Sequence, residues 1–484
     1  MTFSQEQKDA GNAILRCRDG EVVAVQAVAG AGKTKLLVEA NNRIEGRKLY
    51  TTFSKSLSLE AEELFDQKST MVKTFHAYCR YAVIELGLGG NRQGKRSITT
   101  SFSFRNITDT ISDDDRGLVV DMMKEYFSSE FISIHKFFRT KNLTEEIKNI
   151  VIFYIREMVN KNIPVTFGFI VKWYHILLYR GLYSPGYYDA IYIDEVQDFE
   201  PVGLEIFKLL PAKRKVIVGD HNQAIFSSFT YCTNGFDYLK ESITKSLPLT
   251  RSYRVNIADA KLVQTFMRQH VDSEFIFKGH NHHDNTIHTV GYISRTNTSV
   301  IAKMIELDNR GVEYKLARKV GNLFSLVLNL IYMKKDGHIT GEYSFLNHDV
   351  EVYYSDKKLQ KSTTLFKYVW KTHSSNSAIK QACMLIATHG SRKLIDLHQQ
   401  AKKRESSKKE CSISVGTVFS YKGLTVDEAI IDKDLNLDYL NDKKLTAEEK
   451  HIENLIRYVA VSRHRIKLSN CDWLQNYKED QNDR

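Results

Sequence analysis

A glycine-rich turn between an apparent strand and a helix constrains this chain more than any other feature. Residues 21–28 form a short apolar run typical of a buried strand, and helical character continues from Lys35. Between them, residues 27–34 read Ala-Val-Ala-Gly-Ala-Gly-Lys-Thr, which is the P-loop pattern except that Ala27 replaces the first glycine. Small residues let backbone N–H groups approach a phosphate closely, so the pattern predicts a nucleotide site.

The P-loop pattern assigns chemistry to individual residues. The Lys33 ammonium is expected to reach the outer phosphates, and the Thr34 hydroxyl is expected to ligate magnesium. The residues expected to line the nucleotide in this segment are Ala29, Gly30, Ala31, Gly32, Lys33, Thr34 and Lys35.

A P-loop also needs acids that hold magnesium and orient the attacking water. The run Ile191-Tyr-Ile-Asp-Glu-Val-Gln-Asp198 supplies them at the end of an apolar strand pattern. Asp194 is the second predicted magnesium ligand, and Glu195 is the candidate base. Paired acids at a strand end are also common as surface caps, but a P-loop upstream favours the functional interpretation.

Further apolar runs indicate the fold class. Residues 190–193, 216–218, 412–415 and 429–431 each read as a buried strand followed by polar or glycine-bearing residues. Such runs predict an α/β protein with parallel sheets flanked by helices. An acidic triplet at Asp113-Asp-Asp115 is expected to be a solvated turn rather than a metal site.

Composition narrows the class of protein. A chain of 484 residues suggests about three or four lobes. The formal net charge of +11 favours a polyanionic partner. Six scattered cysteines indicate reduced thiols, with neither a zinc module nor a disulfide framework. Since no leader-like or membrane-spanning run is visible, a cytoplasmic protein without a membrane partner is expected.

The glycine loop and the Asp-Glu-Val-Gln-Asp run together resemble superfamily 1 DNA helicases of the UvrD/Rep type, and further matching segments follow in that family's order. The stretch 166–174, just ahead of the acidic run, is similar to the F-box DNA helicase branch, although no F-box is recognisable. The resemblance implies two RecA-like P-loop NTPase lobes, each interrupted by a mainly helical insertion, with ATP and Mg²⁺ as cofactors.

The resemblance also assigns roles outside the P-loop. Gln7 matches the glutamine that reads adenine, Tyr253 the tyrosine that stacks on it, and Gln223 the sensor of the γ-phosphate. Arg254 matches the arginine that meets the γ-phosphate, and Arg463 the arginine that crosses the cleft between lobes. Taken alone, Arg463 equally fits a surface ion pair. The implied catalytic set is Lys33, Asp194, Glu195, Gln223, Arg254 and Arg463.

Matching segments also imply a track for the nucleic acid. Its expected contacts are Phe53, Lys55, Thr74, His76, Phe226, Phe229 and Phe419. Positions outside the P-loop also depart from the family pattern. Ser252 replaces an asparagine, Phe419 replaces a histidine that contacts nucleic acid, and Thr425 replaces a glutamate near the nucleotide sugar.

The implied organisation has six segments. Lobe 1A would hold 1–80 and 185–246, interrupted by helical insertion 1B at 81–184. Lobe 2A would hold 247–297 and 412–484, interrupted by a 2B-like insertion at 298–411.

Two functions remain open at this point. The first is an ATP-dependent 3′–5′ translocase or helicase acting on single-stranded DNA and on junctions with duplex DNA. The second is an ATP-gated sensor subunit that binds nucleic acid and signals to an effector protein such as a nuclease. The intact Lys33, Asp194 and Arg463 favour ATP turnover. The replacements at Phe419 and Thr425 leave the sensor function as an alternative.

Overall fold

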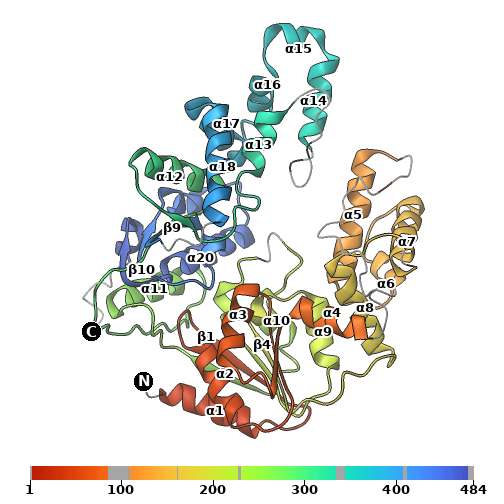
Figure 1. Ribbon diagram of the computed structural model, residues 1–484, viewed down its shortest axis with the longest axis vertical. Coiled ribbons are helices and arrows are strands. Elements are labelled where there is room, and N and C mark those ends of the chain that lie inside the picture. The colour runs from red at the N-terminus through yellow and green to blue at the C-terminus, as the bar shows by residue number, and fades with distance from the viewer. Residues whose placement is uncertain are drawn as a thin grey trace. The chain divides into compact units, whose positions relative to one another are not determined.

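The chain folds into two compact units, Met1–Tyr253 and Arg254–Arg484 (Figure 1). The computed structural model describes residues 3–85, 107, 111–160, 162–226, 230–333, 339, 343, 345–406 and 411–477.

The first unit is built on a six-stranded sheet in the order β3-β2-β4-β5-β1-β6. Every neighbouring pair is parallel. The strands are β1 (Val22–Ala27), β2 (Lys48–Thr52), β3 (Thr70–Thr74), β4 (Ala190–Asp194), β5 (Lys215–Gly219) and β6 (Lys245–Leu249). β2 and β4 are buried at every position, as expected for strands covered on both faces. β6 spans the expected end of lobe 1A at 246 and belongs to this sheet.

Ten helices of the described residues belong to the first unit. They are α1 (Gln5–Arg16), α2 (Lys33–Asn42), α3 (Lys55–Leu64), α4 (Phe75–Glu85), α5 (Asp113–Ser128), α6 (Ile134–Phe138), α7 (Glu145–Val159), α8 (Phe167–Tyr179), α9 (Pro201–Leu209) and α10 (Gly235–Tyr238). α5 to α8 gather into one helical group (Figure 1). Their apolar side chains share a core with the sheet, because Met158 and Tyr174 belong to the same buried cluster as Leu49 and Ile191.

The acidic triplet 113–115 was expected to form a turn, and this expectation is wrong. These residues begin helix α5, where the Ser112 hydroxyl caps the helix by accepting from the Asp115 N–H. Acidic residues are favourable in a first helical turn because they face the positive end of the helix dipole.

The second unit contains a five-stranded parallel sheet in the order β11-β10-β7-β9-β8. The strands are β7 (Val290–Ser294), β8 (Lys315–Leu316), β9 (Ile413–Thr417), β10 (Val426–Ile431) and β11 (His464–Ser469). β8 comes from within the stretch expected as an insertion and pairs with β9. Part of that stretch therefore completes the second sheet.

Helices of the second unit fall into two groups. α11 (Ile257–His270), α19 (Val418–Tyr421), α20 (Ala447–Val461) and α21 (Asp472–Gln475) lie in segments that flank the strands. α12 (Asn297–Asn309), α13 (Ser325–Tyr332), α14 (Leu346–Ser355), α15 (Lys357–Ser362), α16 (Leu365–Thr372), α17 (Ser377–His389) and α18 (Ser391–Ser406) lie between β7 and β9. The second group shares a core that reaches Val415 of β9.

Two parallel sheets flanked by helices confirm the predicted α/β class. The apolar runs at 190–193, 216–218, 412–415 and 429–431 all coincide with strands. Within the part of the chain that the structure describes, no helix is both long and apolar enough to cross a membrane.

Gly291 in β7 tests how closely the second sheet is packed. A Cβ at this position would lie 3.0 Å from the Tyr421 hydroxyl and 3.1 Å from a Val426 methyl. Tyr421 is fully buried and its hydroxyl is held 2.8 Å from Ser414 Oγ, so it has little room to move. Gly291→Ala should therefore lower the free energy of unfolding by about 1–3 kcal/mol, measured by urea denaturation.

Gly117 supplies the control for this substitution. It lies in helix α5, and a Cβ there would meet nothing within 4 Å. Gly117→Ala should stabilise the protein by about 0.5–1 kcal/mol, because alanine is the better helix former. Equal stability of Gly291→Ala and the wild type would show that Tyr421 is packed more loosely than described.

Candidate nucleotide and nucleic-acid sites

The predicted P-loop lies between β1 and α2, at the carboxyl end of the first sheet. Gly30 and Gly32 both take positive φ, 74° and 78°, a conformation that side chains disfavour. The turn is closed by the Ala31 N–H, which donates to the Val28 carbonyl at 3.1 Å. α2 begins directly after Gly32 without a side-chain cap. Its first N–H groups therefore point into a place suited to a phosphate.

Lys33 lies among carboxylates at the start of α2. Its Nζ is 2.9 Å from Glu195 Oε1, and the two side chains are only 13% and 14% exposed. Burial by itself would lower the pKa of Lys33, but the charges of Glu195, Asp194 and Asp220 outweigh burial and raise that pKa. The ammonium group of Lys33 therefore keeps its positive charge. Phosphate oxygens of a bound nucleotide would take the place of its carboxylate partner.

Asp194 ends strand β4 and is held by two donors. The Tyr50 hydroxyl of the neighbouring strand β2 donates to Oδ2 at 2.7 Å, and the Glu195 N–H donates to Oδ1 at 2.9 Å. Burial and the adjacent Glu195 charge raise the pKa of Asp194, although Lys33 and Tyr50 act in the opposite direction. The two hydrogen bonds thus orient the Asp194 carboxyl group, but the nearby positive charge does not offset burial and the charge of Glu195.

A chain of hydrogen bonds joins the candidate base to the candidate sensor. Gln197 donates to Glu195, and the Gln197 Oε1 accepts from the Asp220 N–H at 3.2 Å. Asp220 Oδ2 accepts from Gln223 Nε2 at 2.7 Å. Gly219 makes room for this chain, because a Cβ there would lie 2.1 Å from Gln197 Oε1. A shift of Gln223 would therefore be transmitted to Glu195.

The two residues expected at the adenine ring also meet at the P-loop. Gln7 caps helix α1 by accepting from the Ser4 N–H at 3.0 Å, and its Nε2 donates to the Ala31 carbonyl at 3.1 Å. The Tyr253 hydroxyl lies 3.4 Å from Gln7 Oε1, and the Tyr253 N–H donates to the Gly30 carbonyl at 2.9 Å. The structure thus brings Gln7, Tyr253 and the P-loop together.

Thr34 and Lys35 occupy the first turn of α2. Thr34 is half-buried, whereas Lys35 is exposed and holds its ammonium 5.4 Å from the centre of the Phe3 ring. The Thr34 hydroxyl and the Asp194 carboxylate are hard oxygen ligands of the kind that Mg²⁺ prefers. Around them, three carboxylates face one ammonium, so the chemistry of the donors fits a divalent cation.

The two arginines expected at the γ-phosphate belong to the second unit and converge on Ser462. Arg254 Nη1 donates to the Ser462 carbonyl at 3.3 Å. Arg463 Nη2 donates to Ser462 Oγ at 2.9 Å, and its Nε donates to the Val459 carbonyl at 2.8 Å. Arg463 is 1% exposed, which contradicts the surface ion pair that the residue alone would fit.

Four expected nucleic-acid contacts lie on the first unit near the ends of β2 and β3. Phe53 is 37% exposed, and its ring centre is 6.1 Å from that of His76. Burial lowers the pKa of His76, so its ring is neutral at neutral pH. Thr74 accepts from the Ala77 N–H at 3.3 Å, and Lys55 begins α3 on the surface. Two aromatic rings and one cation therefore gather here.

The remaining three expected contacts are spread over the chain. Phe226 is half-buried after Gln223, and Phe229 lies outside the described residues. Phe419 lies in α19 of the second unit, where the Arg295 guanidinium is 5.4 Å from its ring centre.

Sequence reasoning missed three side chains at these sites. Tyr50 reaches Asp194 only because β2 pairs with β4, and a single sequence does not reveal which strands are neighbours. Phe167 extends the aromatic pair, with its ring centre 6.3 Å from that of His76. Asp220 carried a visible signal, since it follows strand β5 as an acid at the carboxyl end of a parallel strand.

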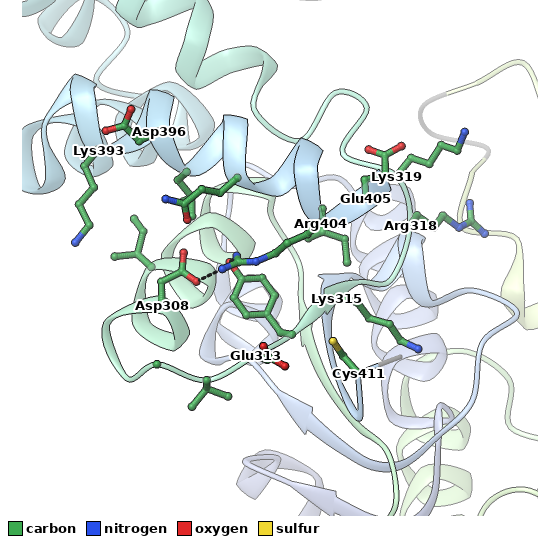
Figure 2. Close-up of a pocket in the computed structure, with 17 residues that line it drawn as sticks. Asp308, Glu313, Lys315, Arg318, Lys319, Lys393, Asp396, Arg404, Glu405 and Cys411 are labelled. Carbon is green, nitrogen blue, oxygen red and sulfur yellow. Dashed lines mark hydrogen bonds and ion pairs between the residues drawn. The ribbon is translucent and has the colours of Figure 1, made fainter. Parts of the chain in front are cut away.

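A cavity of about 850 Å³ lies in the second unit (Figure 2). Arg404 crosses it, 2.6 Å from Asp308 and with its guanidinium 4.4 Å from the centre of the Tyr314 ring. None of the residues expected to bind ATP, Mg²⁺ or nucleic acid lines this cavity. Its volume therefore does not identify the nucleotide site.

The chain is similar to one protein family, to a curated DNA helicase and to a solved helicase structure. Residues 11–229 match the family described as AAA domain. F-box DNA helicase protein 1 of Schizosaccharomyces pombe (strain 972 / ATCC 24843) is 27% identical over 278 residues, which cover 51% of this chain and 31% of that protein. This chain thus spans only about a third of that relative. The crystal structure of arterivirus nonstructural protein 10 (helicase) aligns with 98% of this chain and 64% of that chain, with 11% identity and a TM-score of 0.32.

The AAA match contains the P-loop, the acidic pair and Gln223, which the structure brings together at the carboxyl end of one sheet. Residues 11–229 are therefore similar to the AAA domain family, and the resemblance to the UvrD/Rep type that the motifs predicted is confirmed.

Proposed function

We propose that this protein is an ATP-driven motor that moves 3′ to 5′ along single-stranded DNA and acts at its junctions with duplex DNA. The observation that carries the proposal is the buried contact between Lys33 of the P-loop and Glu195 beside Asp194. A P-loop lysine next to an aspartate and a glutamate at the end of another strand of the same sheet supplies contacts for the phosphates, for magnesium and for the attacking water. DNA as the substrate is inferred from the relative that is named a DNA helicase.

The contact suggests how nucleotide binding would start catalysis. Without nucleotide, Glu195 is neutralised by Lys33 and is a poor proton acceptor. When Lys33 turns to the outer phosphates of ATP, Glu195 is released to accept the proton of the attacking water. Mg²⁺ held by Asp194 and Thr34 would neutralise charge on the phosphates. As the γ-phosphate leaves, a shift of Gln223 would be transmitted through Asp220 and Gln197 and would change the orientation of Glu195.

We further propose that Arg254 and Arg463 complete the phosphate site from the second unit. Arginines that stabilise the charge of the transition state contribute roughly 10³ to 10⁵ in rate. Hydrolysis would then depend on the two units coming together around one ATP. Because Phe53, His76 and Phe226 belong to the first unit and Phe419 to the second, this movement would shift the grip on a bound strand.

One observation favours the second candidate, an ATP-gated sensor that signals to an effector protein such as a nuclease. Phe419 lies beneath the Arg295 guanidinium, at the position where the family histidine contacts nucleic acid. Thr425, which replaces the family glutamate, is exposed. Both changes bear on coupling and leave Lys33, Asp194 and Glu195 in place. ATPase rates with and without single-stranded DNA separate the two functions: a motor should be stimulated by DNA, whereas a sensor should bind DNA in a nucleotide-dependent way without stimulation.

The predicted magnesium site can be tested without turnover. Millimolar Mg²⁺ should raise the melting temperature, and Asp194→Asn should remove that gain. A ligand at a hundredfold excess over its Kd stabilises the native state by about 2.7 kcal/mol. The exposed Asp121, which pairs with Lys124 at 3.4 Å, supplies the control, because Asp121→Asn should keep the gain.

The pH dependence follows from the raised pKa of Asp194. When folding raises the pKa of a carboxyl group, the folded protein loses stability as the pH rises above the ordinary pKa of that group, here 3.8. The reason is that the fold disfavours the ionised form. Mg²⁺ binds that ionised form. The Mg²⁺-dependent gain in melting temperature should therefore grow from acidic to neutral pH. A gain of the same size in Asp194→Asn would place the metal elsewhere.

Arg463→Ala tests the contribution of the second unit. The rate of ATP turnover should fall about 10³-fold while the Kd for ATP changes little, because the arginine acts on the transition state. Lys33→Ala should abolish turnover and sets the lower limit of the assay. Arg310→Ala is the control, since this exposed arginine pairs with Glu306 in the same unit. An unchanged rate in Arg463→Ala would exclude a site completed by the second unit.

Phe226→Ala tests the stacking surface. If Phe226 stacks on bases, binding to single-stranded DNA should weaken by about 1–3 kcal/mol, and by the same amount for every sequence. Fluorescence anisotropy with several homopolymers measures this. Phe153→Ala is the control, since Phe153 is 50% exposed on α7. A loss confined to one sequence would show that Phe226 reads bases rather than stacking on them.

A further inference from the structure

The turn between α20 and β11 carries Arg463 and is held by a buried histidine and an aspartate. His464, the residue after Arg463, is 0% exposed. Its Nδ1 lies 2.8 Å from the Val461 carbonyl, and its Nε2 lies 2.9 Å from Asp259 Oδ2. The imidazole therefore bridges the end of α20 and the first turn of α11.

Each ring nitrogen of His464 faces an oxygen atom. The Val461 carbonyl can only accept, so Nδ1 carries a proton. Burial would raise the pKa of Asp259, but the contacts with His464 and Asn256 outweigh burial and lower that pKa. Asp259 is therefore an anion and also an acceptor. The Asp259 carboxylate thus faces Nε2 of His464 at 2.9 Å, and this contact lies inside the protein.

Asp259 is itself anchored on two sides. Its Oδ2 accepts from Asn256 Nδ2 at 2.7 Å, and its N–H donates to Asn256 Oδ1 at 2.8 Å, which caps α11. Asn256 Nδ2 also donates to the Ile466 carbonyl of β11 at 3.3 Å. The start of α11 and the start of β11 are thus joined twice, by Asn256 and by the contact between Asp259 and His464.

Both candidate catalytic arginines leave the backbone next to this joint. Arg254 is two residues before Asn256 and donates to the Ser462 carbonyl at 3.3 Å. Arg463 is one residue before His464, and its Nη2 donates to Ser462 Oγ at 2.9 Å. Ser462 therefore links the two guanidinium groups, and the joint fixes the backbone on which all three residues lie.

We propose that Asp259 and His464 are positioning residues that hold Arg254 and Arg463 as one rigid pair for the γ-phosphate. This inference rests on the proposed ATPase function. Neither Asp259 nor His464 touches the nucleotide in this proposal, and both act through the arginines. The geometric demand is strict, since a displacement of about 1 Å at a catalytic group can cost about 100-fold in rate.

The kinetic test compares Asp259→Asn and His464→Asn with a matched pair in the same unit. His373 Nε2 lies 2.7 Å from Asp349 Oδ2 between α14 and α16, so Asp349→Asn breaks a similar histidine–aspartate contact away from the two arginines. Asp259→Asn and His464→Asn should lower kcat for ATP about 100-fold with little change in KM. Asp349→Asn should leave kcat unchanged. A kcat of Asp259→Asn equal to that of Asp349→Asn would overturn the proposal.

A double mutant distinguishes positioning from general loss of structure. If Asp259 acts through the arginines, Asp259→Asn should lower kcat much less in an Arg463→Ala background than in the wild type. If the fold reductions in kcat caused by the two substitutions multiply in the double variant, Asp259 acts independently of Arg463 and the proposal is overturned.

Amide hydrogen exchange gives a readout that does not depend on turnover. Exchange over 459–466 should be faster in Asp259→Asn than in the wild type, and unchanged there in Asp349→Asn. Unchanged exchange in Asp259→Asn would overturn the positioning role whether or not ATP is hydrolysed. Absence of ATPase activity in the wild type, with faster exchange in Asp259→Asn, would instead overturn the proposed function and leave the rigid joint standing.

Discussion

One buried ammonium group among three carboxylates organises the first unit. Burial alone would lower the pKa of Lys33, and Asp194, Glu195 and Asp220 would repel one another without the lysine. Three neighbouring strand ends and one helix start meet at this point because β1, β4 and β5 are parallel and adjacent. The arrangement neutralises the acids only in part, so it favours further positive charge. A magnesium nucleotide would bring that charge together with a new partner for Lys33.

The second unit holds its two candidate arginines on a fixed segment of backbone. Arg254 and Arg463 are tied to Ser462, and the backbone around them is fixed by Asn256, Asp259 and His464. A guanidinium held in this way would lose little freedom when it meets a phosphate. In the proposed function, the first unit would bind the nucleotide and the second would sense whether a γ-phosphate is present.

Local patterns predicted much of this arrangement, and pairings between distant segments account for what they missed. The P-loop, the acids after β4 and the parallel strands follow from residues adjacent in sequence, so these were predicted. Tyr50 was not, because its contact with Asp194 depends on the pairing of β2 with β4. The same limit applies to β8, which joins a sheet from within a helical stretch, and to His464, whose partner Asp259 lies far away in sequence.

The most direct test of a shared ATP site is the distance between the two units in solution. Spin labels at Leu64→Cys and Met384→Cys, both about half exposed on different units, report that distance by pulsed electron resonance once the partly accessible Cys411 is replaced by serine. A non-hydrolysable ATP analogue with Mg²⁺ should shift the distance distribution in the parent protein and leave it unchanged in Lys33→Ala. An identical distribution with and without the analogue, under conditions where the analogue is bound, would contradict the account.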